Sequence, residues 1–467
     1  MSMFSNLLGN LPEVKAPEQK RLPFNTKLKW TFIILLSFFT LGVIPLFGLG
    51  QNALSQFEAL SIILGANFGS LLSLGIGPIV TSSIVLQLLT GSGLLKLDLT
   101  THEGKRTFQG LQKSLSLFFI LFEAMIYVLL GGLAPAAVLP PAQYRIMQLI
   151  LIFQLCVGGV LVLFMDEVVS KWGFGSGISL FIAAGVSSSV FVRALSPLNQ
   201  LGHWAFGSGQ PPVGKVWVLI QSLTTGNVST ALLAFFAIFF TIMVFAMAVY
   251  AQSMKVEIPL SFGRIRGHGI RWPLNFIYTS NIPVILVAAL IANLQLAARL
   301  LSNAGYNFLG TFSGNTPTSG IVTWLFAPNI PEAIVTGLFN FSTILHALAY
   351  TIFMMLGAVL FSIFWVQTAG MDSKTQARQI MSSGLQIPGF RRDERVLETI
   401  LNRYINPLTV MGALAVGFLA ASADFLGALT SGTGILLTVM IIYKLYEEIA
   451  HQHMVDMHPA LKRVMKV

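Results

Sequence analysis

The stretch LGIGPIVTSSIVLQLL, residues 74–89, begins a membrane-spanning helix that carries two glycines and a proline in its first turn. It contains no charged residue. The stretch before it, ALSIILGANFGSLLS (59–73), is only moderately apolar and is rich in Gly and Ser. The rest of the chain has to explain why a moderately apolar segment lies directly before a span.

The composition excludes a water-soluble domain. Of the 467 residues, 54% are hydrophobic and only 10% are charged. Apolar runs of about 20 residues, each long enough to cross a hydrocarbon core of ~30 Å, recur along the chain. The sequence therefore predicts an all-α polytopic membrane protein. We expect ten transmembrane helices, at residues 28–48, 74–92, 111–133, 144–165, 173–192, 229–250, 274–296, 341–366, 405–424 and 429–449.

The positive charges predict the orientation of these spans. With the N-terminus in the cytoplasm, 24 of the 28 Lys and Arg residues fall in cytoplasmic segments. The external four are Arg145, Arg193, Lys215 and Arg299. This asymmetry follows the positive-inside rule, and a missed span would destroy it. We therefore expect the N- and C-termini to be cytoplasmic.

A long external linker, residues 193–228, divides the spans into two sets of five. An odd number of spans in each half places the halves in opposite orientations, and inverted repeats of this kind carry their site between the halves. The sequence thus predicts two pseudo-symmetric inverted halves, 28–192 and 229–450. An amphipathic cytoplasmic segment (1–27) precedes them, and a cytoplasmic tail (451–467) follows them.

Ionisable groups are scarce within the spans. Glu123 and Asp424 are the main ones, and neither has an obvious cationic partner, although ion-coupled transporters usually hold several such groups along a path. Cys156 is the only cysteine. The P-loop-like GQPPVGKV (209–216) contains two prolines, which lack the N–H groups that cradle phosphate. The histidines of 451–458 lack a further fixed metal ligand. We expect no enzyme activity, no catalytic residue, no metal site and no cofactor.

Aliphatic residues lie at the openings or kinks of four spans. Gly or Pro marks each opening: GIGP in the second span, GFGSGIS in the fifth, NIPVIL in the seventh and SGTGILL in the tenth. The aliphatic residues at these points are Ile76, Val80, Ile178, Ile182, Ile285, Leu436 and Leu437. Packing inside a helix bundle is one interpretation of them. If they converge, they form a narrow apolar collar that excludes water and ions by dewetting.

Two cytoplasmic loops, 251–272 and 368–404, are basic, and the second is longer than most connections. Contact with anionic lipid headgroups and docking of a soluble acidic partner are alternative interpretations of these loops.

Six sequence blocks together resemble the SecY family, the main subunit of the protein-conducting translocon, and its archaeal branch fits best. The blocks follow the family's order over nearly the whole chain: LGIGPIVTSSIVLQLL, DEVVSKWGFGSGISLFIAAGV, VEIPLSFGRIRG, YTSNIPVIL, QIPGFRRDERVLETILNRYINPLTVMGALAVGFLA and SGTGILLTVMIIYKLYEE. The resemblance implies a central hourglass pore between the two halves, closed at its waist by an aliphatic ring. The matching positions hold Ile76, Val80, Ile178, Ile182, Ile285 and Leu437, with Leu436 as the alternative for the last place.

The resemblance also implies a plug and a lateral gate. The segment at about 54–72 matches the plug, a short helix that blocks the closed pore from outside, and its apolar residues are Ile62, Ile63, Leu64, Phe68 and Leu71. A plug must stay movable and must not partition into lipid, which accounts for the moderately apolar, glycine-rich stretch before residue 74. The gate opens between the second and seventh spans. Thr81 and Asn281 lie near the matching positions and are expected to hold it closed.

In the SecY family, the two basic loops contact the ribosome or a motor ATPase. The matching basic positions here are Arg264, Arg266, Arg391 and Arg392. The resemblance further implies SecE-like and Secβ-like small membrane subunits, signal sequences and nascent polypeptides as partners, in the lipid bilayer of the plasma membrane. The expected function is passage of unfolded secretory polypeptides, with lateral release of transmembrane segments. The alternative is a secondary small-solute transporter with inverted repeats, which requires polar ligands beside its broken helices.

Overall fold

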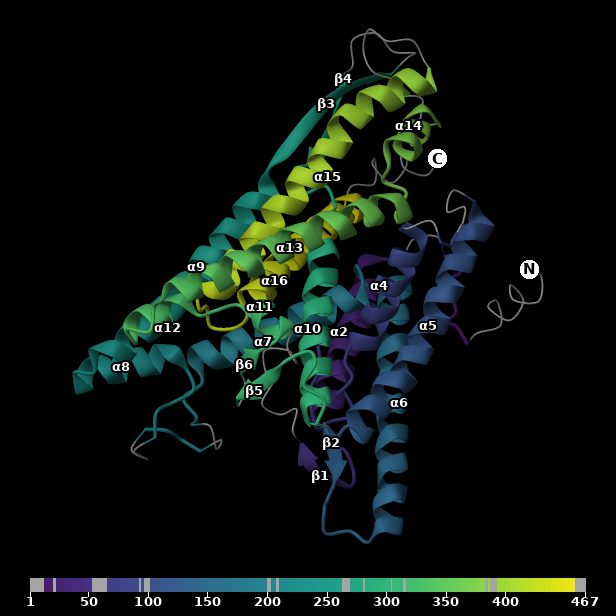
Figure 1. Ribbon diagram of the computed structural model, residues 1–467. Helices are drawn as coiled ribbons and strands as arrows, with labels where there is room; N and C mark the ends of the chain where they lie inside the picture. The colour runs from purple at the N-terminus through teal and green to yellow at the C-terminus, as the bar shows by residue number, and fades with distance from the viewer. Residues whose placement is uncertain are drawn as a thin grey trace.

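Helices make up most of the chain in the computed structural model (Figure 1). The residues that the structure describes are 12–19, 22–52, 65–91, 94–95, 101–199, 203–206, 210–262, 269–279, 282–303, 305–313, 316–382, 385–386 and 393–457.

A helix lies at each of the ten expected spans. The first half contains α2 (Phe24–Val43), α4 (Gly77–Gly91), α5 (His102–Leu129), α6 (Pro141–Trp172) and α7 (Gly177–Leu195). The second half contains α9 (Val228–Ser253), α10 (Ile282–Asn303), α13 (Phe341–Thr368), α15 (Glu394–Phe425) and α16 (Gly432–Met457). Among the described residues, eight of these helices are long and apolar enough to cross a membrane. The other two are α4, which is apolar but has 15 residues, and α16, so the count of ten crossings stays a prediction.

The two halves have equivalent packing. In the first half, α2 contacts α6 and α7, α4 contacts α5, and α6 contacts α5 and α7. In the second half, α9 contacts α15 and α16, α10 contacts α13, and α15 contacts α13 and α16. The same pairs of positions within each set of five are therefore in contact, as a structural repeat requires. Figure 1 shows α5 and α6 on one side and α9, α13 and α15 on the other, with α4 and α10 between them.

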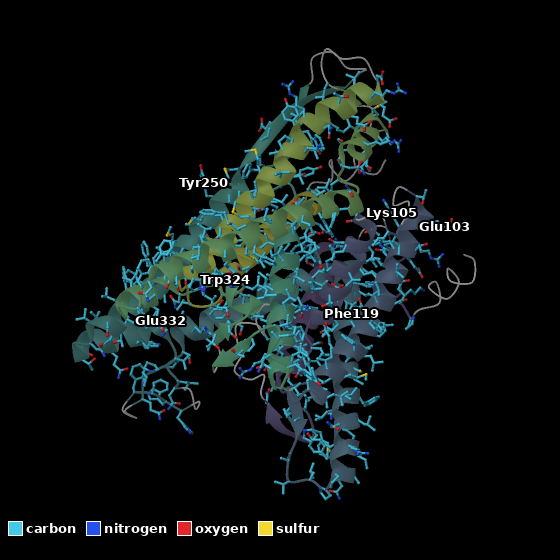
Figure 2. All side chains as sticks on the ribbon, viewed as in Figure 1. Glu103, Lys105, Phe119, Tyr250, Trp324 and Glu332 are labelled. Carbon is cyan, nitrogen blue, oxygen red and sulfur yellow. The ribbon has the colours of Figure 1, made fainter. Side chains whose placement is uncertain are left out.

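The outer faces of the long helices are apolar and exposed. Phe118 and Phe122 on α5, and Phe239 and Phe245 on α9, are all exposed. Figure 2 shows side chains standing off the outer helices, among them the labelled Tyr250 on α9, which is 71% exposed. A soluble protein rarely exposes so much apolar surface, whereas lipid provides an apolar solvent for it.

Short β-sheets lie in the connections between the spans. β1 (Leu49–Asn52) pairs with β2 (Leu133–Pro135), and β5 (Thr311–Ser313) pairs with β6 (Thr316–Ser319), both antiparallel. A three-stranded sheet has the order β4 (Gly269–Asn275), β3 (Lys255–Phe262), β7 (Leu385–Gln386). The short helices are α8 (Lys215–Thr225), α11 (Ile321–Trp324), α12 (Ile330–Val335) and α14 (Ser373–Ser382). The predicted helical membrane fold is confirmed, and the strands of its loops are an addition to it.

The described part of the N-terminal segment lies against α6. Val14 N donates to Glu167 Oε2 (2.9 Å), and Lys171 Nζ donates to Val14 O (2.6 Å). Trp172 Nε1 donates to Lys15 O (3.0 Å). The backbone of this segment is therefore held by side chains at the C-terminal end of α6.

Candidate functional site

The predicted ring residues all lie in or against the largest hydrophobic cluster among the described residues. Five of them are buried, with exposed fractions of 7% or less, and the sixth packs against the cluster from a partly buried position. The buried five are Ile76, Val80, Ile182, Ile285 and Leu437, and the sixth is Ile178. The cluster is larger than the predicted ring and also contains Leu436.

Four helices, two from each half, carry these side chains. Ile76 directly precedes α4 and Val80 lies within it, while α7, α10 and α16 carry the others. Contacts of α4 with α10 and of α7 with α16 cross the boundary between the halves, and α10 contacts α16 within the second half. The cluster therefore occupies the place where inverted repeats carry their functional site.

The helix starts favour Leu437 over Leu436 for the last ring position. Gly177 is the first residue of α7, and Ile182 lies five positions after it. Gly432 is the first residue of α16, and Leu437 also lies five positions after it. Because α7 and α16 are equivalent helices of the two halves, Leu437 is the counterpart of Ile182.

The segment before α4 touches the ring at one end. Its described part, 65–76, consists of turns and bends without a helix. Gly75 has a φ of 53°, in the left-handed region that glycine adopts at little cost, and this turn separates the segment from α4. A Cβ added to Gly65 would lie 3.8 Å from Ile76 Cγ2. Gly65, within the predicted plug, therefore lies next to a predicted ring residue.

The described plug residues pack away from the largest cluster. Phe68 makes an edge-on contact with Tyr127 of α5, with 6.4 Å between the ring centroids. Leu71 packs against a second cluster, formed mainly by α5 and α6. Ile62, Ile63 and Leu64 lie outside the described residues.

A polar contact joins α4 to α10 within this apolar interior. Asn293 Nδ2 of α10 donates to Thr81 Oγ1 (2.8 Å), and Thr81 Oγ1 donates to Glu123 Oε1 of α5 (3.1 Å). Asn281, the predicted partner of Thr81, lies outside the described residues. Asn293 was not predicted from the sequence. Its amide lies within the apolar run LIANLQL, and such an amide indicates a polar partner because unpaired polar groups are costly in a membrane interior.

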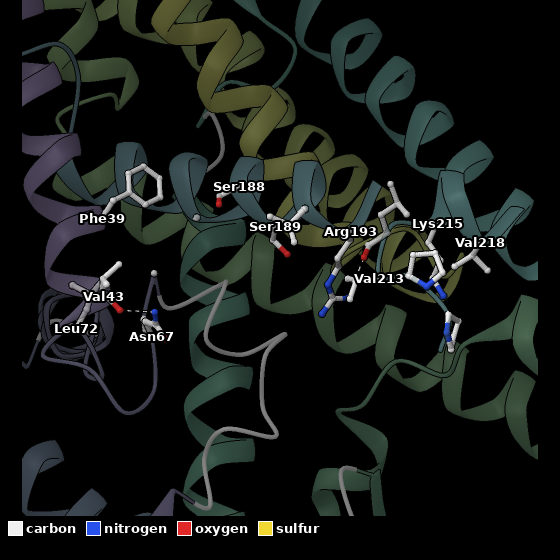
Figure 3. Close-up of a pocket in the computed structure, with 18 of the residues that line it drawn as sticks. Phe39, Val43, Asn67, Leu72, Ser188, Ser189, Arg193, Val213, Lys215 and Val218 are labelled. Atoms are coloured by element: carbon white, nitrogen blue, oxygen red, sulfur yellow. Dashed lines mark hydrogen bonds between the residues drawn. The ribbon is translucent and has the colours of Figure 1, made fainter. Parts of the chain in front are cut away.

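A cavity of about 1280 Å³ lies between α2, the segment before α4, α7 and the linker that follows α7. Figure 3 shows Ser188, Ser189 and Arg193 along α7, with Asn67 on one side of them and Lys215 on the other. Arg193 Nη1 donates to Leu429 O (3.1 Å), which ties the wall of this cavity to the residues before α16. The predicted orientation places the cavity on the external side.

The two basic loops meet in the three-stranded sheet. Ser261 and Phe262 of β3 pair with Gln386 and Leu385 of β7, so the loop after α9 is joined to the loop after α13. The predicted docking residues Arg264, Arg266, Arg391 and Arg392 lie outside the described residues. In the sequence, the first two follow β3 and the last two precede α15.

Comparisons of the sequence give one family. The SecY family model matches residues 70–446. The chain is 47% identical over 466 residues to the protein translocase subunit SecY of Methanothermobacter thermautotrophicus, covering 98% of this chain and 97% of that protein. It is 41% identical over 459 residues to the protein of the same name from Methanocaldococcus jannaschii, covering 98% of each.

Comparisons of the fold agree with those of the sequence. The chain matches a solved protein-conducting channel with a TM-score of 0.83, at 41% identity and over 99% of both chains. It matches a SecY structure concerned with the plug domain and the closed state at 0.82, and Sec61 of the canine ribosome–channel complex at 0.80, each at 41% identity and over 99% of both chains. The chain therefore belongs to the SecY family and is a channel subunit of a Sec translocon, not an enzyme.

Proposed function

We propose that unfolded polypeptides pass through the aliphatic collar formed by Ile76, Val80, Ile178, Ile182, Ile285 and Leu437. The observation that carries this proposal is the convergence of these side chains from both halves into one buried cluster. Aliphatic side chains offer no ligand to ions or water, so a narrow collar of them stays dry and closed to ions.

The segment before α4 is the plug that closes the collar from outside. Its moderate hydrophobicity and its separation from α4 at Gly75 support this role, because both allow it to leave the pore without entering lipid. The external cavity next to it gives a displaced plug and an emerging polypeptide a place to go.

Thr81 and its partners hold the lateral gate closed. The contact with Asn293 supports this role, because it joins α4 to α10 where the family's gate would open. A signal sequence that inserts between these helices replaces the contact and reaches lipid. Asn281 remains a candidate for a second contact at the same gate.

The docking surface consists of the two basic loops with Arg264, Arg266, Arg391 and Arg392. Guanidinium groups suit the phosphates of ribosomal RNA, so the expected cytoplasmic partner is the ribosome. The pairing of β3 with β7 supports a single surface, because it joins both loops. The protein lies in the plasma membrane with both termini cytoplasmic, and SecE-like and Secβ-like subunits complete the complex.

The small-solute transporter is not favoured, because the collar is aliphatic where such a transporter needs polar ligands. The polar side chains of Thr81, Asn293 and Glu123 bond to one another instead.

Reconstituted vesicles test the proposed function. Vesicles that hold the complete complex should import a labelled secretory precursor and should take up no small solute. Saturable uptake of a small solute without precursor import would contradict the proposal.

Resting conductance tests the collar. Replacing Ile76 and Val80 by Gly should increase the ion leak of the closed channel, whereas Leu88→Gly, at a more exposed site on α4, should not. Unchanged conductance of the first variant would remove these residues from the ring.

A further inference from the structure

Two carboxylates lie at equivalent helix-to-helix connections of the two halves, one between α6 and α7 and one between α15 and α16. Asp166 lies near the C-terminal end of α6, and Ile178 N in the first turn of α7 donates to Asp166 Oδ1 (3.0 Å). The first amides of a helix have no partner within the helix. Asp166 therefore caps the helix that ends the first half.

Asp424 has the same role in the second half. It lies near the C-terminal end of α15, and Thr433 N in the first turn of α16 donates to Asp424 Oδ1 (2.7 Å). The hydroxyl of Thr433 also donates to this carboxylate, at Asp424 Oδ2. Tyr350 Oη of α13 donates to Asp424 Oδ2 (2.7 Å). This residue, for which the sequence offered no partner, is therefore a cap that joins three helices.

At both connections the backbones of the two helices pack closely. A Cβ added to Gly177 would lie 2.6 Å from Asp166 Cα, and a Cβ added to Gly432 would lie 2.0 Å from the backbone of Ala423. Each capped helix therefore begins directly against the end of the helix before it. A side chain at either glycine would push the two helices apart.

Both capped helices carry ring residues, and they carry them at equivalent positions. Asp166 bonds to the amide of Ile178, itself a ring residue, and Ile182 lies one turn further along α7. Leu437 lies one turn after Thr433 on α16. The start of each helix therefore sets the depth and direction of its ring residues.

We propose that Asp166 and Asp424 are positioning residues of the valve, and that each fixes the first turn of a ring-bearing helix. The proposal rests on the collar proposed above. Without the carboxylate, the amide of the first turn loses its partner, and the turn rearranges to satisfy it. The ring residues then shift relative to one another, and the dewetted collar opens to ions.

The test is the resting ion conductance of the full complex in planar bilayers. Asp166→Ala and Asp424→Ala should each raise it by about fivefold, the change expected from the loss of a typical helix cap. Asp166→Asn should stay near the unmodified value, because Asn is an equally good cap. Asp424→Asn keeps one acceptor for Thr433 N but replaces the Oδ2 acceptor of Tyr350 by an amide donor, so its leak should lie between those of the unmodified channel and Asp424→Ala. The matched control is Thr101→Ala, which removes the cap of α5 (Thr101 Oγ1 accepts from Gly104 N at 3.1 Å), a helix that carries no ring residue.

Should an alanine variant fail to assemble, the Asp→Gln variant replaces it. Gln keeps a polar side chain but moves the acceptor by one carbon, and it should leak as well. Conductance at the unmodified value in the Ala or Gln variants would overturn the proposal, and so would an equal leak in Thr101→Ala. Ile182→Gly separates the two proposals. If it does not leak, the collar itself is wrong; if it leaks and the Asp variants do not, only the role of the carboxylates is wrong.

Discussion

Thr81 carries the polar contact of α4 with α10 at a single oxygen atom. Its hydroxyl accepts from Asn293 of α10 and donates to Glu123 of α5, so three helices meet there. Interhelical hydrogen bonds in membranes contribute ~0.6 kcal/mol on average and rarely more than about 1.7 kcal/mol. A contact of this strength keeps a gate closed at rest and still yields to an inserting apolar segment.

The Thr81–Asn293 contact predicts the sign of the coupling energy in a double-mutant cycle. Thr81→Val leaves the Asn293 amide without its acceptor, and Asn293→Leu removes the donor, so each should favour the open gate. The double variant places two apolar side chains together and should open the gate less than the sum of the single effects, because removing both partners costs less than stranding one. Loss of the Thr81–Glu123 bond is common to Thr81→Val and the double variant, so it cancels in the cycle. The measurement is the fraction of a marginally apolar test segment that enters lipid instead of crossing the membrane.

The ratio of inserted to translocated test segment should change about threefold in each single variant and less in the double variant. Strictly additive effects of the two substitutions would show that these side chains do not act on the gate together.

At the scale of elements, α6 holds the segment before α4 by close contact. A Cβ added to Gly158 would lie 1.9 Å from Leu71 O, a backbone atom that has no room to move aside. Gly158→Ala should displace this segment at a cost of about 1–3 kcal/mol. The expected result is a higher resting conductance with unchanged import of precursor.

Gly42→Ala is the matched control for this prediction. Gly42 faces the same segment from α2, but its added Cβ would meet no atom closer than 3.6 Å. The control should therefore conduct as the unmodified channel does. Equal leaks in both variants, or none in Gly158→Ala, would contradict the assigned contact.

The N-terminal segment is held at α6 by charge as well as by its backbone. The hydrogen bond and attraction of Lys171 lower the pKa of Glu13 below its usual value. The pKa of Glu13 is lower in the docked state, so the Glu13–Lys171 pair stabilises docking at pH values above the usual pKa of Glu. This stabilisation is lost as the pH falls through the lowered pKa of Glu13. Docking should stay constant from neutral pH to about pH 5 and weaken below about pH 4.

Protease cleavage within residues 12–19 measures this docking. Glu13→Gln removes the titrating group, so its cleavage should be faster at neutral pH and should change less on acidification. A pH profile identical to that of the unmodified chain would show that Glu13 does not hold the segment.

At the scale of the whole molecule, composition and charge were sufficient to predict the architecture. Apolar length predicted where the helices lie, because the bilayer thickness sets the length of a span. The odd number of spans in each set permitted two inverted halves, and the equivalence of their packing was evident only in the structure. The pairing of β3 with β7 was not predictable, since it depends on the approach of loops far apart in the sequence.

Single contacts were harder to predict than helices. Thr81 was predicted as a gate residue, but its partner Asn293 lies twelve positions beyond Asn281, and the sequence alone does not fix how α10 slides against α4. The sequence indicated Asp424 only as an ionisable residue within a span, and it gave no prediction for Asp166. Their common role became evident only when both halves were compared in three dimensions.

The most direct test of the polypeptide path is a photocrosslink from position 182 to a secretory chain stalled in transit. Ile182 is 1% exposed at the junction of the halves, whereas Phe239 on the outer face of α9 is 49% exposed and serves as the control. A photoreactive residue at position 182 should crosslink to the stalled chain, and one at position 239 should not. Crosslinking at position 239 and none at position 182 would contradict a path through the aliphatic collar.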